Sequence, residues 1–135
     1  QEAGFLRARE QFEKACEAKI GQKCKNPDAP EKRETWKKAG ELYESALAAA
    51  PGRDEAPEAA MNAAYAYKQI GEYNKAISLY NLFISDYGSD VRLNALQKGD
   101  PKTKAAPDPK KYGERIGYLG EAYSALGETY YSFVN

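Results

Sequence analysis

Apolar residues recur at three- and four-residue intervals along most of the chain, which is the spacing of one face of an α-helix. Segments rich in Gly, Pro and Asp interrupt this pattern, chiefly at 21–30, 51–54 and 88–109. The pattern predicts six helices, over residues 3–20, 32–50, 56–70, 73–87 and 110–126, and a sixth that starts near 128. The period-two alternation typical of strands is nearly absent. The expected fold is therefore all-α, built from antiparallel helix hairpins.

Two signatures recur along the predicted helices. The first occurs as Trp36-x-x-Ala39-x-x-x-Tyr43-x-x-Ala46 and again as Tyr73-x-x-Ala76-x-x-x-Tyr80-x-x-Phe83. The second occurs as Ala60-x-x-Ala63-Ala64-x-x-Tyr67-x-x-x-Gly71 and again as Ile116-x-x-Leu119-Gly120-x-x-Tyr123-x-x-x-Gly127. Small residues such as Ala64 and Gly120 let a neighbouring helix approach closely, and Gly71 and Gly127 suit a tight turn at a helix end.

These spacings resemble the tetratricopeptide repeat. Residues 56–88 match one complete copy, and residues 111–135 match part of a following one. Residues 3–50 resemble an irregular hairpin, because Phe5-x-x-Ala8-x-x-x-Phe12 repeats the second-helix signature in a first-helix place. Residues 89–110 form a long insertion before the fifth helix, in which Asp90 to Gln97 can add a helical turn or two. The resemblance implies one domain over 1–135, stacked as a right-handed superhelix, within a longer protein.

The resemblance also assigns roles to side chains. The core positions of the repeat are Ala39, Tyr43, Ala46, Ala63, Ala64, Tyr67, Ala76, Tyr80, Leu119, Gly120 and Tyr123. The residues of each first helix that face away from its second helix line a concave groove for a peptide. They are Met61, Asn62, Tyr65, Lys68, Gln69, Tyr118, Glu121 and Ser124. The alternative is that these eight residues are only exposed helix surface.

Composition removes several function classes. The 135 residues include 20 basic and 20 acidic side chains and no histidine. A net charge of zero argues against a general nucleic-acid binder, which needs a surplus of Lys and Arg. Without histidine there is no Ser-His-Asp or Cys-His catalysis and no His-ligated metal. No apolar run approaches the length of about 18 residues that a membrane span requires. We therefore expect a protein without enzymatic activity, cofactor or transmembrane segment.

The two cysteines, Cys16 and Cys24, flank a predicted helix break. On one continuous helix they would lie about 12 Å apart, too far for a disulfide. If the helix ends by Gly21, the chain can fold back and close the bond, which would indicate an oxidising compartment. The alternative is two unrelated thiols. We do not expect a zinc site or a reactive role, because two cysteines without histidine cannot complete a zinc site.

Residues 98–111 hold five lysines against two aspartates, Asp100 and Asp108. The lysines are Lys98, Lys102, Lys104, Lys110 and Lys111. Such a basic loop can contact an acidic partner or lipid headgroups. The alternative is a solvated connector that Pro101, Pro107 and Pro109 keep extended.

The expected function is a non-catalytic scaffold whose groove holds a peptide or helix of a partner protein, with a mixed or hydrophobic peptide as its ligand. Residues 75–88 resemble repeats of bacterial envelope proteins that help to build assembly or motility machines. With the candidate disulfide, this favours a periplasmic or otherwise extracytoplasmic location, the cytoplasm being the alternative. Two other functions stay open: a regulatory or structural appendage of a larger enzyme, and a module that self-associates through its open C-terminal helix.

Overall fold

In the computed structural model, residues 2–134 form six α-helices and one short 3-10 helix, and the side chains of residues 2, 133 and 134 are not described. Residues 1 and 135, which bound the predicted domain, lie outside the described residues. The α-helices are α1 (Glu2–Cys16), α2 (Arg33–Ala49), α3 (Ala56–Gln69), α4 (Tyr73–Asp86), α5 (Asp90–Lys98) and α6 (Pro109–Val134), and the 3-10 helix is Pro30–Lys32. The all-α prediction is confirmed.

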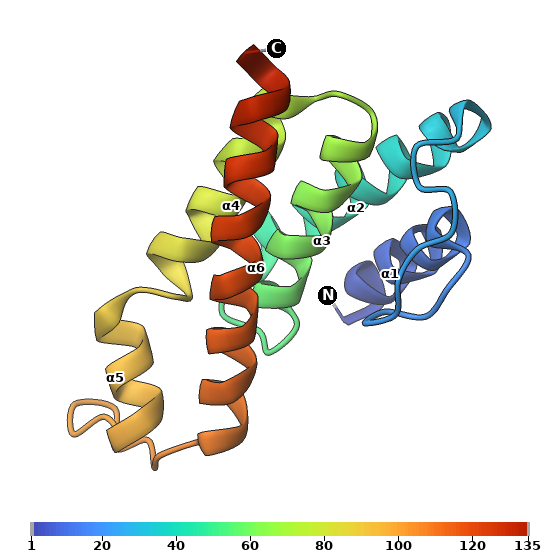
Figure 1. Cartoon of the computed structure of the whole chain (residues 1–135). Coiled ribbons are helices and arrows are strands. Elements are labelled where there is room, and N and C mark those ends of the chain that lie inside the picture. Colours follow the sequence, from blue (N-terminus) through green and yellow to red (C-terminus); the bar gives the residue numbers. More distant parts are fainter. Residues whose placement is uncertain (1, 135) are drawn as a thin grey trace.

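The long helices pack in order along the chain, each against its neighbour (Figure 1). Helix α2 lies between α1 and α3, and α4 lies between α3 and α6. Helix α3 also touches α1 and α6. The helices therefore form two layers, with α1, α3 and α6 in one and α2 and α4 in the other, which is consistent with a tetratricopeptide-like arrangement. Helix α5 packs on α6 at one end of the molecule (Figure 1).

Two predicted helix boundaries are wrong. Helix α1 ends at Cys16 rather than near residue 20, because Glu17 has a φ of 57° and the N–H of Lys25 donates a hydrogen bond to the carbonyl oxygen of Cys16. The predicted break at Gly127 does not exist, and α6 runs through it as one helix of 26 residues. Buried Leu126 and Thr129 on either side of Gly127 hold this part of α6 against the fold, and such packing outweighs the weak helix propensity of glycine.

The turn after α3 forms where the sequence predicts it. Gly71 has a φ of 77°, a conformation that glycine adopts at little cost. The N–H of Gly71 donates to the carbonyl oxygen of Lys68 at 3.2 Å, and the N–H of Glu72 donates to that of Tyr67 at 2.9 Å. This pair of bonds satisfies carbonyls at the helix end and turns the chain directly into α4.

Most of the predicted core is buried between the two layers. The buried members are Ala39, Tyr43, Ala46, Ala63, Ala64, Tyr67, Ala76 and Tyr80, and Leu119 is half-buried. The prediction is wrong for Gly120, which is exposed, and for Tyr123, whose side chain is 58% exposed. Helix α6 meets the fold through another face, that of Ala122 and Leu126. Within residues 2–134 no later helix covers Gly120 and Tyr123.

Candidate functional site

A groove with a volume of about 620 Å³ lies on the layer formed by α1, α3 and α6. Its walls come from α6 on one side and from the loop after α1 on the other, and α3 lies between them. Seven of the eight predicted groove residues line it, namely Met61, Asn62, Tyr65, Lys68, Tyr118, Glu121 and Ser124. Gln69, the eighth, does not. Residues that the repeat register places on two different helices therefore meet in one concave surface.

Aromatic rings form much of the groove surface. Tyr65 is half-buried, and its ring lies 5.7 Å from that of Phe12 and 5.5 Å from that of Trp36. On the α6 side, the ring of Tyr118 meets that of Phe83 edge to face at 5.9 Å. Contacts of this kind hold rings in fixed orientations. The groove therefore presents rigid apolar area.

The phenols of the groove are neutral near pH 7, and burial extends the pH range over which they stay neutral. Burial raises the pKa of Tyr65. The pKa of Tyr118 is raised to about 12, chiefly by burial and then by the negative charges of Glu58 and Glu121. Near neutral pH both hydroxyls remain protonated, so each can donate and accept a hydrogen bond. The aromatic groove residues thus carry polar ends that can orient a ligand.

Two polar groove residues are already engaged within the fold. The side-chain amide of Asn62 donates a hydrogen bond to the hydroxyl of Tyr43 at 3.2 Å. The ammonium of Lys68 forms a salt bridge at 3.1 Å with Glu128, which joins α3 to α6. Neither side chain stands ready as a clamp for a peptide carboxylate.

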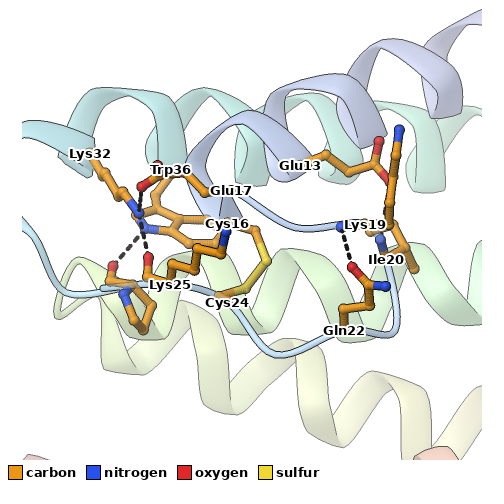
Figure 2. The surroundings of a disulfide bond; sticks show 11 residues. Glu13, Cys16, Glu17, Lys19, Ile20, Gln22, Cys24, Lys25, Lys32 and Trp36 are labelled. Carbon is orange, nitrogen blue, oxygen red and sulfur yellow. Dashed lines mark hydrogen bonds and ion pairs between the residues drawn. A yellow bond between two sulfur atoms is a disulfide. The ribbon is translucent and has the colours of Figure 1, made fainter.

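The loop wall of the groove is fastened by a disulfide, and Figure 2 shows its surroundings. The sulfur atoms of Cys16 and Cys24 lie 2.10 Å apart. Within this loop the N–H of Ile20 donates to the carboxylate of Glu13 at 3.0 Å, and the N–H of Lys19 donates to the side-chain oxygen of Gln22 at 3.3 Å. The bonded arrangement of the two cysteines is therefore the one that the structure supports.

Side-chain contacts also attach the residues on both sides of the disulfide loop to α2 and to the 3-10 helix before it. The indole N–H of Trp36 donates to the carbonyl oxygen of Pro27 at 2.7 Å, and Lys32 pairs with Glu17 at 2.5 Å (Figure 2). Trp36 is buried and belongs to the ring cluster that supports Tyr65. The disulfide loop and the aromatic part of the groove are thus held by the same residue.

Several groove residues were not predicted as such. They are Phe12, Gly21, Gln22, Lys23, Cys24, Tyr80, Gly120, Ala125 and Glu128. Phe12 and Tyr80 carry repeat signatures that indicate core positions, and both do reach the core as well as the groove. The signature could not place residues 21–24 in the groove, because their position depends on the disulfide and on the early end of α1.

The lysine-rich segment 98–111 lies away from the groove. It turns back on itself, since the N–H of Asp100 donates to the carbonyl oxygen of Ala105 at 3.0 Å. Lys111 forms a salt bridge with Asp54 at 2.7 Å, whereas the other four lysines of the segment are exposed. The pKa of Asp54 is lowered, first by its hydrogen bond from Lys111. Part of the basic charge is therefore used within the molecule.

Comparisons with known proteins neither support nor contradict the resemblance to the tetratricopeptide repeat. No family model, curated protein or solved structure matches this chain. Over the described residues, no helix combines the length and apolarity that a membrane crossing requires. In the same part of the chain, no group of three or more Asp, Glu or Cys side chains is arranged to hold a metal ion. What the site can do must therefore be argued from the groove itself.

Proposed function

We propose that this chain is a non-catalytic interaction module that holds a peptide or helical segment of a partner protein in the groove between α6 and the disulfide loop. One observation carries the proposal: the half-buried rings of Tyr65 and Tyr118, together with the buried ring of Phe12, line one open groove of about 620 Å³. Exposed aromatic area that is already fixed by packing binds at a low entropic cost. Tyrosine is also among the residues most enriched in energetically dominant contacts.

The charges on the groove walls narrow the chemistry of the ligand. Lys68 and Glu128 neutralise each other. The remaining charged residues are Lys23 on the loop wall and Glu121 on the α6 wall, and both are exposed. A segment that places apolar side chains on the rings, with an acidic and a basic residue on opposite flanks, satisfies both walls. This ligand fits the mixed peptide that the sequence predicts.

The disulfide supports an extracytoplasmic setting for this function. Disulfides persist in oxidising compartments and are rare in reducing ones. The Cys16–Cys24 bond fixes a wall of the groove, so the proposed site depends on its oxidation state. Together with the resemblance of residues 75–88 to bacterial envelope repeats, this leads us to propose a role in an envelope assembly or motility machine.

Peptide selection tests the groove directly. A random library of short peptides is displayed and selected against the purified chain, and the enriched peptides are titrated by fluorescence anisotropy. We expect Ser124→Trp, which fills the groove from an exposed position, to weaken binding at least about tenfold. Tyr123→Ala is the control, because Tyr123 lies on the same helix outside the groove. Failure to enrich any peptide, or equal binding to Ser124→Trp, contradicts the proposal.

A second experiment tests whether the loop wall contributes to peptide binding independently of the rest of the fold. The double variant Cys16→Ser with Cys24→Ser should bind the selected peptides more weakly, while circular dichroism still shows a helical fold. Mass spectrometry of the chain isolated from its native cells with thiols blocked should show the bonded pair. Two free thiols in that preparation contradict the proposed extracytoplasmic setting, and unchanged affinity in the double variant removes the loop from the binding site.

A further inference from the structure

Helix α6 carries a regular stripe of residues that are all exposed in the described fold. Three large members of this outer stripe are spaced by seven residues, and three glycines alternate with them at intervals of three and four. The stripe consists of Gly113, Ile116, Gly120, Tyr123, Gly127 and Tyr130. The large side chains are 42%, 58% and 49% exposed. In Figure 1, α6 lies along the near face of the molecule, with no other element in front of it.

The three glycines of the outer stripe have no role within the chain. A Cβ placed on Gly113, Gly120 or Gly127 would meet nothing within 4 Å. None of them has a positive φ. Each weakens the helix by about 1 kcal/mol relative to alanine. Glycine at such positions is useful where another backbone or a bulky side chain comes close to the helix. The stripe thus combines exposed large side chains with vacant spaces of matching spacing.

We propose that the outer stripe of α6 pairs with the same stripe of a second copy of this chain, in an antiparallel helix pair. A two-fold axis between Glu121 and Ala122 relates the two helices. Gly120 then lies opposite Tyr123 of the second copy, Ile116 opposite its Gly127, and Gly113 opposite its Tyr130. Every layer contains one large residue and one glycine, so each side chain fills the space above a glycine, as knobs fill holes between packed helices.

The parallel alternative lacks this complementarity. In a parallel pair in register, Tyr123 would face Tyr123 and Gly120 would face Gly120. Layers would then be alternately overfilled and empty, and both conditions weaken packing. Both arrangements have a two-fold axis and would stop at a dimer, so the filling of the layers decides between them. The alternation of large residues and glycines therefore specifies an antiparallel dimer.

Charge does not oppose the pairing. From Ile116 to Tyr131, the charged residues of α6 are Glu121 and Glu128. Both line the groove instead of belonging to the outer stripe, and Glu128 is already paired with Lys68. Like charges facing one another across the axis would cost energy, and none lies on the stripe. Of the stripe residues, Gly120 also lines the groove, so the second copy would border one edge of the groove.

The size of the stripe sets the expected strength. It extends over about five turns of helix, and two such helices bury on the order of 800 Å² in total, below the standard interface size. We therefore expect a weak dimer that forms at tens to hundreds of micromolar. Such a contact would bring two grooves together on one assembly, and two linked sites hold a divalent partner more tightly than one.

Sedimentation equilibrium between roughly 5 and 500 µM tests the dimer, a range that brackets the strength expected of so small an interface. We expect the average mass to rise with concentration. Gly120→Leu fills the space reserved for Tyr123 and should weaken association at least about tenfold. Gly117→Leu is the matched control, because Gly117 has the same open surroundings on the same helix but lies off the stripe. A chain that stays monomeric throughout overturns the proposal, and so does an equal effect of the two variants.

Cross-linking tests the direction of the two helices. Gly120→Cys and Tyr123→Cys are made as separate proteins, and each is oxidised alone and as an equal mixture. The native cysteines are bonded to each other, so the new thiol is the one that reacts. The antiparallel pair predicts disulfide dimers in the mixture and few in either protein alone. Efficient cross-linking of Tyr123→Cys with itself would instead indicate a parallel pair and overturn the proposed geometry.

Discussion

Helices α3 and α6 carry the same signature but lie in different surroundings. Ala64, Tyr67 and Gly71 in and after α3 correspond to Gly120, Tyr123 and Gly127 in α6. Ala64 and Tyr67 are buried, and Gly71 ends its helix. In α6, the equivalent side is exposed and the helix continues. One pattern therefore produces a helix in both places but a core in only one.

The difference arises from neighbours in the fold. Helix α3 is enclosed by α2 on one side and α4 on the other, so both of its flanks are buried. Helix α6 meets α4 and α5 and only touches α3. Ala66 of α3 and Ala122 of α6 occupy equivalent positions and are both fully buried. The two helices thus share the flank that faces the preceding hairpin and differ on the flank that a following helix would cover.

The equivalent tyrosines provide the strongest test of this comparison. Tyr67 is 2% exposed and donates a hydrogen bond to Glu44, so Tyr67→Ala should lower the free energy of unfolding by about 3–5 kcal/mol. Tyr123→Ala should change it by no more than about 0.5 kcal/mol. Urea unfolding followed by circular dichroism at low micromolar concentration measures both. Similar losses in the two variants would show that Tyr123 is buried in solution.

Larger side chains at the equivalent positions 64 and 120 test the same flank of α3 and α6 by adding volume instead of removing it. Ala64 is fully buried, and Ala64→Leu should destabilise the fold by about 1–3 kcal/mol, because the extra atoms have no space. Gly120→Leu meets open space and replaces a poor helix former, so it should stabilise the monomer by up to about 1 kcal/mol. Thermal unfolding of both variants at low concentration is the measurement. A large loss for Gly120→Leu would place a neighbour against this flank within the monomer.

Features of the fold that depend on local sequence could be predicted, whereas features that depend on contacts with distant parts of the chain could not. The bounds of α3 and α4 are predicted to within one residue, because Gly71 and the repeat register determine them locally. The end of α1 could not be predicted, since it depends on a hydrogen bond from Lys25 and on the fold-back that brings Cys24 to Cys16. The exposure of Tyr123 depends on whether another helix covers α6, which no property of α6 itself reports.

The residues of the candidate site also differ in whether the local sequence determines their position. The residues that α3 and α6 contribute to the groove follow from the helical period, and Met61, Tyr65 and Tyr118 lie where that period places them. The position of the loop wall, residues 21–24, cannot be predicted from a helical period. Gly40 shows a further limit: a Cβ there would lie 2.9 Å from the ring of Tyr67, so this contact requires glycine, although the signature read over residues 36–46 leaves position 40 unspecified.

Gly71 and Gly127 occupy equivalent positions, and replacing each with alanine should change the free energy of unfolding by a smaller amount, with opposite signs. Gly71 has a φ of 77°, and Gly71→Ala should cost about 1–2 kcal/mol, because a side chain strains this conformation. Gly127→Ala lies within a helix with open surroundings and should gain about 0.5–1 kcal/mol. Differential scanning calorimetry can resolve both shifts. A loss of stability in Gly127→Ala would indicate that α6 breaks at this residue in solution, as the signature predicts.

The smallest effect concerns the acidic residues Glu58 of α3 and Glu114 of α6, which also occupy equivalent positions. Burial raises the pKa of Glu58 above 4.5, and this outweighs the opposing charge of Arg9, whose guanidinium lies 3.7 Å away. A carboxyl group whose pKa is higher in the folded state does not lower the stability of the fold at pH values below its unfolded-state pKa. Its cost grows as the pH rises through the folded pKa, so Glu58 lowers stability at neutral pH.

Glu58→Gln should therefore be more stable than the wild type at pH 7 by a few tenths of a kcal/mol, and this gain should disappear by about pH 4. Urea unfolding at intervals between these pH values measures the difference. Glu114→Gln should give a smaller gain of the same sign, because the negative charge of exposed Glu114 also contributes to raising the pKa of Glu58. A gain that does not vary with pH would mean that Glu58 is hydrated when the chain is folded. The flank of α3 next to α1 would then be as open to solvent as the flank of α6.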